Sequence, residues 1–186
     1  MGSQPILVVV SGPPGSGKTT LAHALARAVP CPAICRDEIK EGLVHAVGRP
    51  APPEGDDPLN RPANAAFFGT LRLLHGAGVT VVAEAAFQDR LWRPGLEGWA
   101  DTAALRIVHC VTDPDVARER IARRVRATSP ARAAHGDAEL LRALDAGTSW
   151  TASFQPVSIE AASIRVDTTD GYAPDLAAVL RLVTGR

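Results

Sequence analysis

The chain has 186 residues, of which 46% are hydrophobic, so it can form one domain with a hydrophobic core of ordinary size. Its 20 basic and 20 acidic residues give a formal net charge of zero, which argues against a dedicated binder of duplex DNA or anionic membranes but not against a local basic patch. No run of about 18 apolar residues is present, and the apolar start lacks the basic segment of a signal peptide, so we expect one cytoplasmic domain over residues 1–186.

The first predicted element is a buried strand over the apolar, β-branched residues 6–10, which leads into the sequence GPPGSGKT at residues 12–19. A strand, the pattern G-x-x-x-x-G-K-T and a helix from about Lys18 to Ala28 form the usual setting of a phosphate-binding loop (P-loop). Glycines there adopt positive φ and lack a β-carbon, so backbone N–H groups can surround a phosphate. The residues expected to bind a nucleotide triphosphate are Gly12, Pro14, Gly15, Ser16, Gly17, Lys18, Thr19 and Thr20.

Two side chains of this loop have separate expected roles. Lys18 is expected to reach the β- and γ-phosphates, and the Thr19 hydroxyl to bind Mg²⁺. The positive end of the following helix dipole points at the same anion. The alternative, a glycine-rich turn that arose by chance, is disfavoured because strand, full motif and helix occur together.

The rest of the chain alternates between predicted strands and helices. In chain order we expect a strand at 31–35, a helix from residue 36, a helix at 64–75, a strand at 79–84, a helix at 88–100 with Pro94-Gly95 as a candidate break, a strand at 105–111, and helices at 113–126 and 138–146, followed by a strand at 163–166 and a helix at 175–183. This alternation predicts an α/β fold with a parallel sheet covered on both faces. Ligands should bind beyond the carboxyl ends of its strands.

Residues 48–62 hold five prolines and two glycines, so a substrate loop over about 46–62 and a plain solvated connection both remain open. The segment at about 126–138 is expected to form a flexible lid. Cys31, Cys35 and Cys110 lack metal-type spacing, and we interpret all three as buried, reduced thiols.

Two acidic residues fall at predicted strand ends near the P-loop. Asp37 follows the second strand, where a carboxylate can orient an acceptor hydroxyl and take its proton, although it can equally be a residue that only caps a helix. Glu84 ends the strand VTVVAE, where it can hold Mg²⁺ or position the acceptor; the alternative is a solvent-facing strand end.

The helix at 113–126 is rich in arginine. Its buried stripe is expected to consist of Ala117, Ile121 and Val125, and Arg120 and Arg124 flank that stripe four residues apart. We therefore expect this arginine pair to stabilise charge on a transferring phosphate. The competing interpretation is a solvated basic helix face.

Four motifs in order, GPPGSGKTT, CRDEIKE, VVAEAAF and DPDVARERIARR, make the chain resemble the small P-loop kinases, a group that includes phage-type polynucleotide kinase, chloramphenicol phosphotransferase and the zeta-toxin kinases. The resemblance implies a three-layer fold with a five-stranded parallel sheet of order 2-3-1-4-5 and a small helical lid. It also implies that Asp37 activates the acceptor and that Arg120 and Arg124 clamp the donor phosphates. Two positions depart from the pattern: Lys40 replaces an arginine typical of polynucleotide kinases, and Glu84 replaces an Asp.

The sequence thus predicts an ATP-dependent kinase that moves the γ-phosphate to a hydroxyl of a small molecule. Lys18, Asp37, Arg120 and Arg124 are the expected catalytic residues, and ATP with Mg²⁺, held by Thr19 and Glu84, is the expected cofactor pair. The alternatives are a 5′-hydroxyl polynucleotide or nucleoside kinase and an ATP-binding regulator without transfer activity. A nucleic-acid acceptor is disfavoured by the neutral net charge. We expect no membrane partner, and either a monomer or a homodimer.

Overall fold

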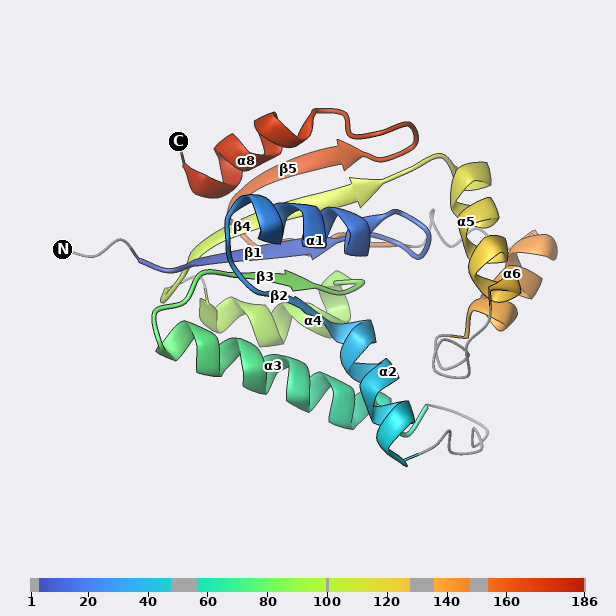
Figure 1. Cartoon of the computed structure of the whole chain (residues 1–186), viewed down its shortest axis with the longest axis horizontal. Helices are drawn as coiled ribbons and strands as arrows, with labels where there is room; N and C mark the ends of the chain where they lie inside the picture. The colour runs from blue at the N-terminus through green and yellow to red at the C-terminus, as the bar shows by residue number, and fades with distance from the viewer. Residues whose placement is uncertain (1–3, 48–56, 100, 128–135, 148–153, 186) are drawn as a thin grey trace.

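A computed structural model describes residues 4–47, 57–99, 101–127, 136–147 and 154–185 (Figure 1). Five parallel strands form one sheet in the order β2-β3-β1-β4-β5. The strands are β1 (Ile6–Ser11), β2 (Ala33–Cys35), β3 (Val81–Glu84), β4 (Ala104–Val111) and β5 (Ala162–Asp167). The predicted fold class and strand order are therefore confirmed.

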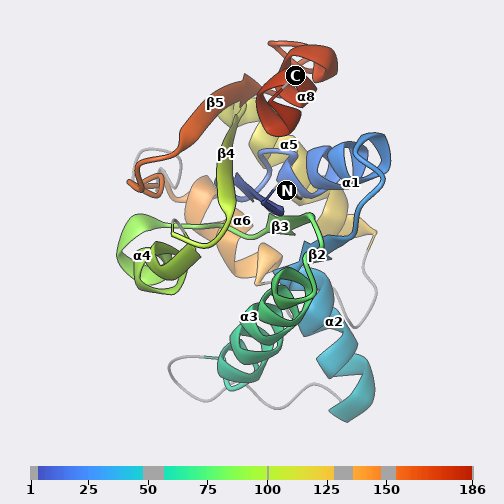
Figure 2. The same cartoon turned by 90° about the vertical axis from the view of Figure 1, so that its left-hand side faces the viewer.

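Helices cover both faces of the sheet, as Figure 2 shows from the end. They are α1 (Lys18–Ala28), α2 (Arg36–Val47), α3 (Asn60–Gly76), α4 (Asp89–Leu96), α5 (Pro114–Arg126), α6 (Asp137–Asp145) and α8 (Leu176–Thr184), with a short 3₁₀ helix, η1 (Glu97–Trp99). Within the described part of the chain, no helix has both the length and the apolar character needed to cross a bilayer.

Strand β1 lies at the centre of the core because alternate side chains face opposite sides of a strand. Leu7 and Val9 pack with α3 and α4 residues such as Phe67 and Leu96 in one buried cluster. Val8 and Val10 point the other way and pack against α1 and α8 in a second cluster. The uninterrupted apolar run of this strand reflects burial on both faces, as in other parallel sheets.

The register of the sheet brings chemically important strand ends together. Val10 of β1 pairs with Glu84 of β3, and Cys35 of β2 pairs with Glu84 from the other side. Figure 1 shows the strand arrowheads pointing to the end of the molecule where α2, α5 and α6 lie. The carboxyl edge of the sheet is therefore the region in which the expected site residues converge.

Several element boundaries differ from the sequence-based predictions. Helix α3 begins at Asn60 rather than at residue 64, because Pro62 falls in its first turn, where a missing N–H costs no hydrogen bond. Strand β2 is shorter than expected and begins at Ala33. Pro94 lies inside α4, and the expected long helix continues as η1 from Glu97.

Two expected segments fall largely outside the described residues. Of the Pro-rich connection, residues 48–56 are not described, and of the expected lid, residues 128–135 are not described. The helix after the lid begins at Asp137, one residue earlier than expected. The start of α5 agrees with its prediction, since the Asp113 carboxylate accepts hydrogen bonds from the N–H groups of Asp115 and Val116.

Candidate functional site

The predicted P-loop connects β1 to α1, and two of its glycines have left-handed backbone conformations. Gly15 has φ of 79°, and Gly17, which precedes the first residue of α1, has φ of 74°. Lys18 is only 9% exposed, although it is a lysine. The loop thus buries a cation next to the N-terminus of a helix, an arrangement that favours an anion.

The P-loop is held tightly against α5. A β-carbon at Gly15 would lie 2.7 Å from the backbone oxygen of Ala117 and 2.9 Å from its α-carbon. Both separations are too short for a real contact, and the left-handed φ adds strain for any other residue. Gly15 therefore serves the close packing of two segments as well as the curvature of the loop.

We predict that Gly15→Ala destabilises the fold by more than about 2 kcal/mol, since a left-handed backbone alone costs roughly 1–2 kcal/mol and the contact with Ala117 adds to it. Gly78→Ala is the matched control, because Gly78 has φ of 75° but nothing within 4 Å of an added β-carbon. Urea unfolding of both variants measures the difference. Equal losses of stability would mean that the packing against Ala117 contributes nothing.

Glu84 at the end of β3 connects the P-loop residues to the neighbouring strand. Its carboxylate is 1% exposed, accepts a hydrogen bond of 3.1 Å from the Thr19 hydroxyl, and lies 3.6 Å from Lys18 Nζ. Burial raises the pKa of this carboxyl, the Lys18 ammonium opposes that rise, and the Asp37 carboxylate adds to it. Lys18 therefore compensates the buried charge, and the two carboxylates interact electrostatically.

The donor set at this point fits a Mg²⁺ ion. The Thr19 hydroxyl and the Glu84 carboxylate are oxygen donors, which hard cations prefer. Within the described part of the chain, Glu84 Oε1 is buried without a hydrogen-bond partner. A buried carboxylate oxygen without such a partner can accept a hydrogen bond from a metal-bound water or bind the metal itself.

Asp37, the expected acceptor-side base, lines the same cavity as the P-loop. It lies in the first turn of α2, its side chain is 45% exposed, and its Oδ1 accepts a hydrogen bond of 3.0 Å from Arg36 Nη1. The cavity has a volume of about 360 Å³. Its P-loop wall consists of Pro14, Gly15, Gly17, Lys18, Thr19 and Thr20. Gly12 and Ser16 are buried and do not line it.

The two expected phosphate-binding arginines have different surroundings. Arg124 lines the cavity, and its guanidinium donates two hydrogen bonds, of 2.8 and 2.9 Å, to the Asp137 carboxylate. Arg120 does not line the cavity. Its guanidinium donates to the carbonyl oxygens of Gly15 (3.2 Å) and Thr168 (2.6 Å), so it ties the P-loop to the turn after β5. Of these two arginines, Arg124 is the one that lies beside the space a ligand would fill.

A model for the family described as "AAA domain" matches residues 7–146, which is most of the chain and includes the P-loop, Asp37, Glu84 and both arginines. The chain belongs to this AAA domain family. A search of curated proteins found no match. The resemblance to P-loop kinases is confirmed, and membership in the family implies nucleotide binding.

Solved structures resemble this AAA domain over 81–98% of its length. A "putative kinase" from Chloroflexus aurantiacus is 24% identical, with 98% of each chain covered and a TM-score of 0.79. The APS kinase CysC from Mycobacterium tuberculosis, solved with AMPPNP and APS, is 15% identical, with 98% and 99% covered and a TM-score of 0.62. The Pnkp1/Rnl/Hen1 RNA repair complex contains a chain that is 16% identical over 81% of this chain and 48% of that one, with a TM-score of 0.57. At these identities the likeness establishes a kinase-like fold.

Lys40 of this AAA domain does not behave as a solvated lysine. It is 5% exposed, and its ammonium lies 2.8 Å from Asp57 Oδ2 and donates a hydrogen bond of 3.1 Å to Asn60 Oδ1. The same Asn60 oxygen accepts a hydrogen bond of 2.7 Å from Arg36 Nη2. Lys40 therefore joins α2 to the start of α3 instead of facing the cavity.

Sequence reasoning did not place among the site residues one polar residue of the AAA domain that supports the P-loop. It left open whether the turn after the fifth strand binds a base or only starts the last helix. Thr168 is 4% exposed, and its hydroxyl donates a hydrogen bond of 2.8 Å to the Ser16 carbonyl and accepts one from Arg120. The only signal in the sequence is its place directly after a predicted strand, which a simple turn shares. Glu38 and Glu41 were likewise not singled out, although both line the cavity beside Asp37.

Proposed function

We propose that the chain is an ATP-dependent kinase that transfers the γ-phosphate of ATP to a hydroxyl group of a small molecule. The observation that carries this proposal is the shared cavity, which has Lys18 and Thr19 on one wall and Asp37 on another. A phosphate in the P-loop and a hydroxyl beside Asp37 would meet in that space. The fold-level likeness to APS kinase supports the same class of reaction.

The proposed reaction assigns one task to each group. Asp37 accepts the proton of the acceptor hydroxyl as its oxygen attacks the γ-phosphorus, and the bond to the bridging oxygen breaks to release ADP. Lys18 and Arg124 stabilise the charge on the phosphoryl group. Thr19 and Glu84 would hold Mg²⁺, which would supply positive charge beside the bound phosphates. Arg120 acts indirectly, because it holds Gly15 of the P-loop in place.

The charge of the cavity supports an acceptor that is neutral or cationic near its reactive hydroxyl. The α2 wall carries the carboxylates of Asp37, Glu38 and Glu41. Among the described residues that line the cavity, the cations are Lys18 at the end of the P-loop and Arg124 on α5, and neither belongs to α2. A phosphate on the acceptor would meet repulsion there, whereas hydroxyls and ammonium groups would find hydrogen-bond acceptors.

The main alternative is a 5′-hydroxyl polynucleotide or nucleoside kinase. The Pnkp1-containing complex favours it at the level of the fold. The pairing of Lys40 with Asp57 and Asn60 counts against it, because this lysine is engaged inside the protein at the position where that group tends to have an arginine. A nucleotide-binding regulator without transfer activity is the second alternative, and Asp37 on the cavity wall counts against it.

We expect the purified chain, incubated with γ-labelled ATP and Mg²⁺, to label at least one compound in a panel of polyols, sugars and amino alcohols. Phosphorylated sugars and 5′-hydroxyl oligonucleotides serve as anionic acceptors in the same assay. Preferential labelling of oligonucleotides would replace the proposal with the polynucleotide alternative. Binding of ATP without transfer to any acceptor, measured by calorimetry, would favour the regulator.

A further inference from the structure

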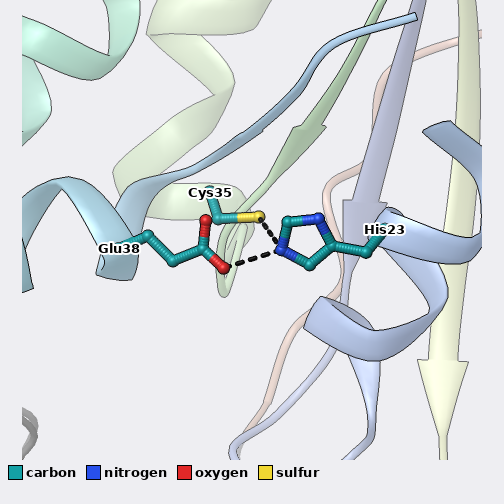
Figure 3. Close-up of side chains that lie close together, drawn as sticks. All are labelled: His23, Cys35 and Glu38. Carbon is teal, nitrogen blue, oxygen red and sulfur yellow. Dashed lines mark hydrogen bonds and ion pairs between the residues drawn. The ribbon is translucent and has the colours of Figure 1, made fainter. Parts of the chain in front are cut away.

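Three side chains with metal-binding atoms converge where α1, β2 and α2 meet, as Figure 3 shows. His23 belongs to α1, Cys35 ends β2, and Glu38 lies in the first turn of α2. The distance from His23 Nε2 is 2.7 Å to Glu38 Oε1 and 3.7 Å to Cys35 Sγ, and the three donor atoms all lie within 4.8 Å of one another. Three consecutive elements thus direct one imidazole, one thiol and one carboxylate at a common point.

These distances are close to those of a tetrahedral zinc site. Zinc binds sulfur at about 2.3 Å and nitrogen or oxygen at about 2.0 Å, which separates neighbouring ligand atoms by roughly 3.3–3.6 Å. The sulfur–nitrogen distance of 3.7 Å lies just above that range. The carboxylate of Glu38 would have to move back by roughly half an ångström, which its flexible, 49% exposed side chain permits.

The combination of a thiol, an imidazole and a carboxylate favours Zn²⁺ over Mg²⁺. Thiolate and imidazole are soft or borderline ligands that favour Zn²⁺, whereas Mg²⁺ prefers oxygen donors alone. Cys35 is 2% exposed and lies beside a second carboxylate, that of Glu84, so burial and charge repulsion would both oppose a thiolate there unless a cation bound to it. We propose that His23, Cys35 and Glu38 form a Zn²⁺ site.

Binding of Zn²⁺ would replace the S–H bond of Cys35 by a sulfur–zinc bond. The thiol of Cys35 loses its proton to solvent as the sulfur–zinc bond forms, while neutral His23 and ionised Glu38 supply the other two ligands. Three protein ligands leave a fourth position for water. The metal would tie α1, which follows the P-loop, to the first turn of α2, which carries Asp37 next to Glu38. The proposal does not depend on the proposed kinase activity.

We expect the full-length, nucleotide-free chain in excess Mg²⁺ to bind one Zn²⁺ ion, as measured by competition with a chromophoric chelator. Co²⁺ used as a probe should give a near-ultraviolet sulfur-to-metal charge-transfer band. Cys35→Ser should abolish that band. His23→Ala and Glu38→Gln should each weaken Zn²⁺ binding by more than about tenfold, since even groups outside the ligand shell cost that much when removed.

Two matched variants test whether the loss of metal binding is specific to His23, Cys35 and Glu38. Cys31→Ser removes a half-buried thiol four residues before Cys35, and His45→Ala removes an exposed imidazole of α2. Both should bind Zn²⁺ and Co²⁺ like the wild type. If circular dichroism shows that Cys35→Ser does not fold, the Zn²⁺ affinity of His23→Ala decides whether the cluster binds the metal. Absence of stoichiometric Zn²⁺ binding, or equal binding by the wild type and His23→Ala, would show that the three groups form only a hydrogen-bonded cluster.

Discussion

Replacing Asp37 by asparagine should lower the rate of phosphoryl transfer by roughly 10²–10⁴-fold, the usual contribution of a general base, while ATP binding changes little. The asparagine oxygen can still accept the hydrogen bond that Arg36 donates to Asp37 Oδ1, so the position of α2 should be preserved. The amide cannot accept the acceptor's proton, which is the task the proposal gives to this residue. Single-turnover transfer and calorimetric binding of ATP, measured on the same preparation, separate the two effects.

Asp115→Asn provides the matched control for this experiment. Asp115 is the second residue of α5, as Asp37 is of α2, so both substitutions remove a carboxylate from the first turn of a helix. Asp115 is exposed and does not line the cavity. Its variant should transfer phosphate at the wild-type rate. Full activity of Asp37→Asn would refute the proposed base, because transfer would then proceed without this carboxylate.

Replacing Lys18 by methionine should reduce transfer by roughly 10²–10³-fold, the typical effect of removing one preorganised charge-stabilising group. Lys18 is the cation that follows the last glycine of the P-loop, and it lines the cavity. Methionine keeps much of the length and the apolar part of the side chain but removes its charge. The kcat of transfer at saturating ATP is the quantity to measure.

This substitution also leaves the buried Glu84 carboxylate without its neighbouring ammonium. The destabilisation caused by an unpaired Glu84 must therefore be separated from the loss of the contact between Lys18 and phosphate. The double variant Lys18→Met/Glu84→Gln removes both charges and should recover thermal stability relative to Lys18→Met. Its transfer rate should stay low, because the contact of Lys18 with phosphate is not restored and the proposed Mg²⁺ ligand Glu84 is lost as well. Recovery of transfer together with stability would mean that Lys18 serves mainly to neutralise Glu84.

The sequence was sufficient for the parts of the fold that local patterns specify. The P-loop motif lies between an apolar strand and a helix. The positions of Asp37 just after β2 and of Glu84 at the end of β3 follow from the alternation of strands and helices. The strand order 2-3-1-4-5 came from the resemblance to P-loop kinases, not from periodicity. The start of α3 was predicted incorrectly because prolines favour loops, yet Pro62 is tolerated in a first helical turn.

The details of the site depend on contacts between segments far apart in the chain, which local patterns do not report. Helical spacing placed Arg120 and Arg124 on one edge, but it did not reveal that Arg120 would bond to the Thr168 carbonyl, 48 residues away. The same limit applies to Lys40, whose partners Asp57 and Asn60 both fall within the Pro-rich segment 48–62 of the sequence. His23 and Cys35 are 12 residues apart, and only the packing of α1 against β2 brings them together.

The close contact between Gly15 and Ala117 has a consequence for how a bound nucleotide would be sensed. Because the first turn of α5 is fixed against the P-loop, that helix cannot slide toward a phosphate as a rigid rod. Arg124, two turns further along, is engaged by the first residue of α6. For Arg124 to reach a phosphate it must exchange one anionic partner for another. Arrival of the nucleotide would therefore remove this link at the start of α6 and leave the ion pair between Arg118 and Asp145 to hold the two helices together.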